Sequence, residues 1–229
     1  MLQRIRNGRR FCPEAGWDDA TGDLFVRDGK FVSAPADLQS VDESIDASGM
    51  VVMAGGVDLH THIGGGKLNI ARMLLPEFLS QQRSAITPDA AAISPFVPDS
   101  FATAVRYLRM GYTSCFEPAV LPTNARAAHA EMADIPGIDC GGYCLLGNEP
   151  ALLQMLADDV PQAVLNDYVA AMLIATKCIA VKVVNAGGVD AFRFHRKPLD
   201  VDQPHPKYGV TPATVIRRLA TAVHEIGLP

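Results

Sequence analysis

The sequence GGVDLHTHI, residues 55–63, decides the fold assignment. As a short strand, it places every second side chain on one face, about 7 Å apart, so Asp58, His60 and His62 share a face. In a barrel that face points to the axis, and two imidazoles at the mouth of a strand are suited to begin a zinc-type site. Asp58 is then placed to orient one imidazole by a hydrogen bond. Histidines that are merely hydrogen-bonded within a core are the alternative.

Downstream of this stretch, strand-like and helix-like segments alternate to the end of the sequence, including one long helical stretch expected from about Glu149 to Thr176. Such alternation predicts parallel strands joined by right-handed crossovers, which defines the α/β class. Residues 53–229 supply roughly four β/α units, half of a (β/α)8 TIM barrel. We therefore expect the N-terminal half of a metal-dependent hydrolase barrel, in a truncated chain. An open α/β sheet that is complete at this length is the alternative.

The first 52 residues follow a different pattern. Short alternating runs surround an Asp28-Gly29 step, which joins LFV at 24–26 to KFV at 30–32. Two such runs on either side of Asp-Gly are a strong signal for a β-hairpin with a two-residue turn. A further alternating run covers residues 43–53. We expect residues 1–52 to form the N-terminal part of a small β lobe.

Lys182 is the second chemical signal, because it interrupts the apolar segment CIAVKVVNAGG at residues 178–188. A buried charged lysine is costly, so its amine must be paired or lose its proton. A neutral amine can add CO2 to become a carbamate that bridges two metal ions, and such a pair is suited to hydrolysing an amide-like C–N bond. A lysine that reaches solvent or a carboxylate is the alternative. Asn185 follows on the same segment, where it could shape the site or form a plain turn.

Composition argues against several classes of function. The chain has 229 residues, 48% of them hydrophobic and 20% charged, with a net charge of −5 and a pI of about 5.6. It has no basic run with interleaved aromatics, as nucleic-acid binding would favour, and no apolar run of the about 18 residues that a membrane span needs. The five cysteines are odd in number, which favours reduced thiols. We expect a cytoplasmic protein that binds neither nucleic acid nor membrane.

Three segments narrow the assignment to one family. They are VMAGGVDLHTHIGGGKLNIARMLLPE at 52–77, LLGNEP at 145–150 and IATKCIAVKVVNAGG at 174–188. Together they resemble the A subunit of formylmethanofuran dehydrogenase, whose bacterial form belongs to the formyltransferase/hydrolase complex. The resemblance runs from about residue 2 to residue 229. It implies an amidohydrolase-type TIM barrel preceded by part of a small composite β-sandwich lobe.

The resemblance also implies which residues act. It places the metal-binding histidines at His60 and His62 and a carboxylated, catalytic lysine at Lys182, around two divalent metal ions expected to be zinc. The family's remaining metal ligands and its catalytic aspartate fall beyond residue 229. Further candidates for contacting the substrate or orienting a metal ligand are Asp58, Lys67, Asn69 and Asn185.

The implied reaction interconverts N-formylmethanofuran with formate plus methanofuran, the formyl carrier. The implied partners are the other subunits of the complex. Two alternatives share parts of the pattern. A cyclic-amide hydrolase of dihydroorotase or hydantoinase type has the H-x-H pair and the lysine but leaves GGGKLNIARMLLPE at 64–77 unexplained. The other is a catalytically incomplete barrel that serves as a scaffold within a complex.

Overall fold

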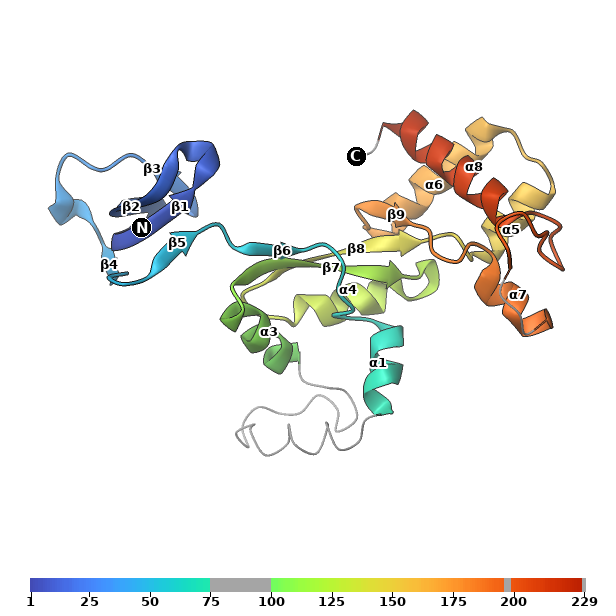
Figure 1. Ribbon diagram of the computed structural model, residues 1–229, viewed down its shortest axis with the longest axis horizontal. Coiled ribbons are helices and arrows are strands. Elements are labelled where there is room, and N and C mark those ends of the chain that lie inside the picture. Colours follow the sequence, from blue (N-terminus) through green and yellow to red (C-terminus); the bar gives the residue numbers. More distant parts are fainter. Residues whose placement is uncertain (75–99, 196–198, 228–229) are drawn as a thin grey trace. The chain divides into compact units, whose positions relative to one another are not determined.

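The computed structural model divides the chain into two compact units, Met1–Gly55 and Gly56–Pro229 (Figure 1). It describes residues 1–74, 100–195 and 199–227. Each unit contains its own sheet. The division falls close to the boundary after residue 52 that the change of sequence pattern predicts.

The first unit is a five-stranded sheet built around β1. Its strands are β1 Leu2–Cys12, β2 Trp17–Arg27, β3 Lys30–Val32, β4 Glu43–Asp46 and β5 Val51–Met53. β1 pairs antiparallel with β2, and its other edge pairs parallel with β4 and then with β5. Two short 3-10 turns, Pro13–Ala15 and Leu38–Ser40, lie between strands. This unit therefore has the strand-rich structure expected of a small β lobe.

The turn between β2 and β3 is the hairpin that the Asp28-Gly29 step predicts. Arg27 pairs with Lys30 across it, so only those two residues form the loop. Asp28 and Gly29 have φ angles of 51° and 76°, both in the left-handed region. A type I′ turn needs this backbone at both central positions, and glycine adopts it without a Cβ penalty. The predicted hairpin is confirmed.

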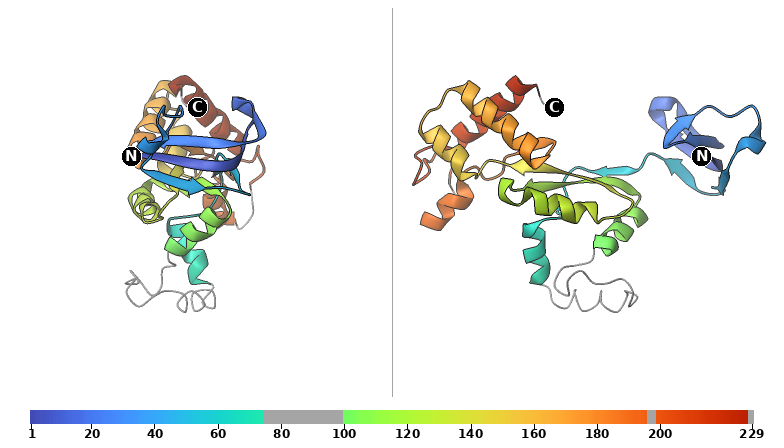
Figure 2. Two further views of the ribbon diagram at one scale, coloured as in Figure 1. Left: turned by 90° about the vertical axis from the view of Figure 1, so that its left-hand side faces the viewer. Right: turned by 180° about the vertical axis from the view of Figure 1, so that it is seen from behind.

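The second unit contains a parallel four-stranded sheet with helices between its strands (Figures 1 and 2). The strands are β6 Gly56–Asp58, β7 Tyr112–Val120, β8 Asp139–Leu145 and β9 Ala180–Lys182. Their order in the sheet, β6-β7-β8-β9, is their order along the chain. A doubly wound sheet reverses its order at a switch point, whereas a barrel adds each strand beside the preceding one. The described sheet therefore matches successive strands of a β/α barrel.

The helices of this unit are α1 Gly66–Met73, α3 Ser100–Arg109, α4 Ala125–Ala133, α5 Pro150–Ala157, α6 Gln162–Thr176, α7 Gly188–His195 and α8 Pro212–Ile226. A 3-10 turn, Pro122–Asn124, precedes α4. α4 packs beside β8, and α6 and α8 lie side by side (Figures 1 and 2). In the part of the chain that the structure describes, no helix is long and apolar enough to cross a membrane.

The segment from Glu149 to Thr176 is not the single helical stretch that the sequence predicts. It forms α5 and α6, which are separated by residues 158–161. Asp159 has a left-handed backbone with φ of 48°, and Pro161 has no N–H to donate to a continuing helix. The break leaves two helices whose apolar faces pack into the same core.

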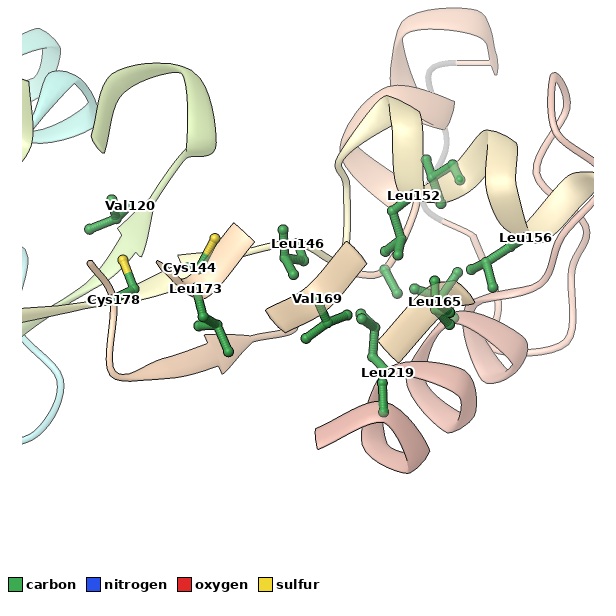
Figure 3. Packing of buried hydrophobic residues seen from close by; sticks show 14 of the residues in the cluster. Val120, Cys144, Leu146, Leu152, Leu156, Leu165, Val169, Leu173, Cys178 and Leu219 are labelled. Atoms are coloured by element: carbon green, nitrogen blue, oxygen red, sulfur yellow. The ribbon is translucent and has the colours of Figure 1, made fainter. Parts of the chain in front are cut away.

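The main core of this unit lies between β8 and the helices α5, α6 and α8 (Figure 3). Leu152 and Leu165 are 0% exposed and Leu219 is 1% exposed, so each of the three helices contributes a fully buried leucine. A smaller cluster contains Ile63, which follows the H-x-H pair, and Cys115 of β7. The smaller cluster anchors the chain directly after the two histidines.

Removal of the N-cap of α8 is expected to destabilise this unit. Thr211 has an extended backbone, and its hydroxyl accepts a hydrogen bond from the backbone N of Thr214 at 3.2 Å. Thr211→Ala leaves that N–H without its partner and should lower the free energy of unfolding by about 1 kcal/mol in a urea titration. Thr211→Ser keeps an accepting hydroxyl and should stay near the wild type. An equal loss in both variants would contradict the capping role.

Candidate functional site

The ends of β6 and β9 carry the residues that the sequence singles out. His60 and His62 follow β6, and Lys182 is the last residue of β9. The carboxyl ends of parallel strands meet at one edge of a sheet, where β/α barrels place their active sites. The two histidine rings have centroids 6.1 Å apart and planes at 84°, and Nζ of Lys182 lies 3.5 Å from Nδ1 of His60. The structure therefore brings His60, His62 and Lys182 together.

The strand that leads to the histidines is shorter than the sequence pattern predicts. β6 ends at Asp58, and Leu59 and His60 lie in a bend. A carboxylate oxygen of Asp58 accepts a hydrogen bond from the backbone N of His60 at 3.0 Å. A local bond of this kind offers the backbone an alternative to ladder pairing. The prediction of one strand through His62 is wrong, and the two histidines lie in the irregular segment, residues 59–63, that follows the strand.

Asp58 binds the backbone of His60, where the sequence pattern predicts a contact with an imidazole. The other oxygen of Asp58 accepts from the hydroxyl of Tyr107 on α3 at 3.2 Å. That hydroxyl also hydrogen-bonds with the hydroxyl of Thr61. Burial raises the pKa of Tyr107, and the nearby Asp58 carboxylate raises it too, so the phenol remains a donor at neutral pH. This network ties the H-x-H segment to α3.

Glu117 of β7 is a site residue that the sequence reasoning did not identify. It is 2% exposed, and one of its carboxylate oxygens lies 2.8 Å from Nδ1 of His62. The carboxylate also accepts from three backbone N atoms: those of Ile63 at 2.9 Å, Gly64 at 3.4 Å and Ala119 at 3.0 Å. A carboxylate within the mostly apolar strand YTSCFEPAV is the signal that could have identified it, because a buried charge needs partners.

Asn69 links two helices. Its side-chain amide on α1 donates to Glu131 of α4 at 3.0 Å, and the same carboxylate oxygen accepts from the backbone N of Gly65 at 2.7 Å.

Lys67 is also in α1, but its side chain lies outside the described residues. Asn185 occupies the turn between β9 and α7, with a left-handed φ of 45°. Contacts of these three candidates with a substrate or a metal ligand stay predictions.

The donor atoms of the site fit part of a metal-ligand set. His60 and His62 supply two imidazoles, a ligand type that zinc prefers. Lys182 fits the set as a carbamate, because a protonated amine offers no lone pair. Within residues 1–74, 100–195 and 199–227, no three His, Cys, Asp or Glu side chains form a group that could hold a metal ion. A divalent ion held by His60, His62 and Lys182 would therefore need further ligands.

The strands of the second sheet follow the order of the chain, and their carboxyl ends carry two imidazoles and a lysine. These features define a β/α-barrel protein of the metal-dependent hydrolase class. The model of the amidohydrolase family matches residues 43–199. The chain belongs to this family. The predicted fold class, α/β with part of an amidohydrolase-type barrel after a small β lobe, is confirmed.

Comparison with known proteins supports the narrower resemblance. The chain is 41% identical over 229 residues to the A subunit of the formyltransferase/hydrolase complex Fhc of Methylorubrum extorquens, matching 100% of this chain and 41% of the relative. It is 36% identical over 225 residues to protein FwdA of Methanocaldococcus jannaschii, matching 98% of this chain and 39% of the relative. The resemblance carried by the three sequence segments is thereby confirmed. The chain spans only about two fifths of the length of these relatives.

A solved structure of high similarity agrees over the whole chain. It is the crystal structure of the formyltransferase/hydrolase complex FhcABCD from Methylorubrum extorquens in complex with methylofuran, with a TM-score of 0.87 and 40% identity, covering 100% of this chain and 41% of that chain. A dihydroorotase of Streptococcus pneumoniae is 41% identical over 59 residues, which is 25% of this chain and 14% of the relative. This likeness to a dihydroorotase covers a short segment of the chain.

Proposed function

We propose that this chain is part of a metal-dependent amidohydrolase that interconverts N-formylmethanofuran with formate plus methanofuran, as the A subunit of a formyltransferase/hydrolase complex. The observation that carries the proposal is the 41% identity to the Fhc relative over the full 229 residues, in a chain that brings His60, His62 and Lys182 together. The bond acted on is the C–N bond of a formamide. The partners are the other subunits of the complex.

The residues of the cluster have separate tasks in this proposal. His60, His62 and Lys182 would contribute ligands to two divalent ions, expected to be zinc. The amine of Lys182 would add CO2 and release a proton, and the resulting carbamate would be an anionic ligand. A bound divalent ion supplies Lewis acidity, which polarises a carbonyl oxygen and eases deprotonation of a water. The carbamate thus replaces a cationic amine, which would repel the metal ions, by an anionic ligand.

The substrate class follows from the solved relative. That complex was crystallised with methylofuran, and a methanofuran-type carrier is therefore the expected substrate here. The alternative of a cyclic-amide hydrolase rests on the H-x-H segment, since the dihydroorotase likeness covers 25% of the chain. A scaffold without activity is the remaining alternative, and the close approach of Lys182 to His60 gives a catalytic role more support.

A substrate panel with the intact protein in its complex tests the proposal. We expect hydrolysis of N-formylmethanofuran, with little turnover of hydantoin or dihydroorotate, and about two zinc ions bound per chain. Treatment with a chelator should abolish the activity, and added zinc with bicarbonate should restore it. Faster turnover of the cyclic amides would favour the dihydroorotase alternative. A metal-free protein that hydrolyses none of them would support the scaffold.

A further inference from the structure

The carboxylate of Glu117 has a specific relation to one of the two histidines. We propose that Glu117 is a positioning residue, which fixes the tautomer and the ring orientation of His62 so that its Nε2 is the atom offered to a metal ion. This inference rests on the proposed function for its metal, but its main evidence is the hydrogen bonding of Glu117 itself. One oxygen of Glu117 faces Nδ1 of His62 at 2.8 Å.

Backbone N–H groups hold the carboxylate of Glu117 in place independently of the His62 ring. One oxygen accepts from the backbone N of Ile63 at 2.9 Å and of Gly64 at 3.4 Å. The other accepts from the backbone N of Ala119 at 3.0 Å. An ionised carboxylate can only accept hydrogen bonds. The ring of His62 must therefore donate through Nδ1, and a neutral imidazole with its proton on Nδ1 has a free lone pair on Nε2.

The two partners differ in burial, which assigns their roles. The side chain of Glu117 is 3% exposed and that of His62 is 52% exposed. A buried carboxylate is stabilised only by donors that stay in place, and charge-assisted hydrogen bonds to backbone N–H groups provide them. Glu117 also belongs to β7, which pairs with strands on both sides. It is therefore the fixed partner, and the more exposed imidazole is the group that it orients.

His60 is held in a different way. Its backbone N is bound by Asp58 at 3.0 Å, and its Nδ1 lies 3.5 Å from Nζ of Lys182. The hydrogen bonds of Glu117 go to the ring of His62 and to backbone N–H groups, and none goes to His60 among the described contacts. A change at Glu117 should therefore alter His62 and leave the tautomer of His60 unchanged.

Selective 15N labelling of histidine in the intact, metal-free protein gives a direct test. The signals of His62 are assigned as those lost in His62→Gln. In the wild type they should report a proton on Nδ1. A proton on Nε2 in the wild type would overturn the inference without any variant at Glu117, so this arm of the test does not depend on the folding of a Glu117 variant.

Glu117→Gln then tests the consequence for metal binding. The amide keeps the size of the side chain, and we expect its oxygen to keep the two backbone N–H groups of Ile63 and Gly64. Its NH2 group then faces Nδ1 of His62, which can no longer donate. We expect a change in the His62 tautomer signal and a 10- to 100-fold weaker zinc affinity, measured by competition with a chelator. Unchanged tautomer and affinity would overturn the inference.

Glu149→Gln is the matched control. The carboxylate of Glu149 also accepts from a backbone N–H and a side-chain hydroxyl, those of Leu152 at 2.9 Å and Tyr168 at 2.8 Å. It lies in the same unit but bonds to no histidine in these contacts. This variant should keep the wild-type tautomer and zinc affinity, and an equal loss in both variants would overturn the specific role of Glu117. A wild-type protein that binds no zinc would instead overturn the proposed function itself.

Discussion

Under the proposed function, Lys182→Ala in the intact protein should hydrolyse N-formylmethanofuran at least about 10³-fold more slowly than the wild type, because the proposed carbamate ligand would supply several kcal/mol of metal-dependent stabilisation. Alanine has no amine, so neither the contact with His60 at 3.5 Å nor a carbamate can form. Zinc content should fall in parallel. The measurement is the initial rate of formate release, with metal content determined on the same sample.

Lys177→Ala is the control for this variant. Lys177 caps α6 and is exposed, with a left-handed φ of 54° that alanine would have to adopt as lysine does. Lys177→Ala removes a lysine five residues before Lys182 and leaves the amine of Lys182 at the end of β9 in place. The control should keep the wild-type rate. A wild-type rate in Lys182→Ala would exclude the carbamate and leave the lysine as a structural residue.

Leu165→Ala should lower the free energy of unfolding by about 2–5 kcal/mol. Leu165 is 0% exposed on α6, within the core that α6 shares with β8 and α8 (Figure 3). Truncation removes apolar burial and leaves a cavity in a close-packed region. A denaturant titration of the intact protein, followed by circular dichroism, measures the change.

Ile174→Ala on the same helix is the comparison. Ile174 is 79% exposed, so its truncation removes little buried surface and should change the free energy of unfolding by no more than about 0.5 kcal/mol. The difference between the two variants isolates burial from helix propensity. Similar losses in both would mean that the core does not lie where the structure places it.

Local signals predicted most of the fold. The Asp28-Gly29 step predicts a two-residue hairpin turn, and both residues have a left-handed backbone. The alternation of strands and helices predicted the parallel sheet. These features depend on residues a few positions apart. Pro161 is a local signal for the break between α5 and α6, because proline cannot continue a helix. The apolar pattern on both sides of Pro161 nevertheless favours a single helix.

The site was harder to predict, because its contacts join distant residues. β6 ends at Asp58, whose carboxylate accepts a hydrogen bond from the backbone N of His60. This local hydrogen bond competes with strand pairing. Glu117 and His62 are 55 positions apart along the chain. The spacing of residues within one strand or helix does not predict a contact over that separation. A charge within an apolar strand needs partners, and this criterion singled out Lys182 in the sequence. Glu117 meets the same criterion and could have been identified by it.

The order of the strands has a consequence for synthesis on the ribosome. Because each of β7, β8 and β9 pairs with the strand made just before it, the sheet can grow in the direction of translation. β6 and β7 emerge first, so His62 can meet the carboxylate of Glu117 while later strands are still being made. Lys182 arrives at the end of β9, beside histidines that are already in place. Among these three residues, the lysine is therefore the last to join the cluster.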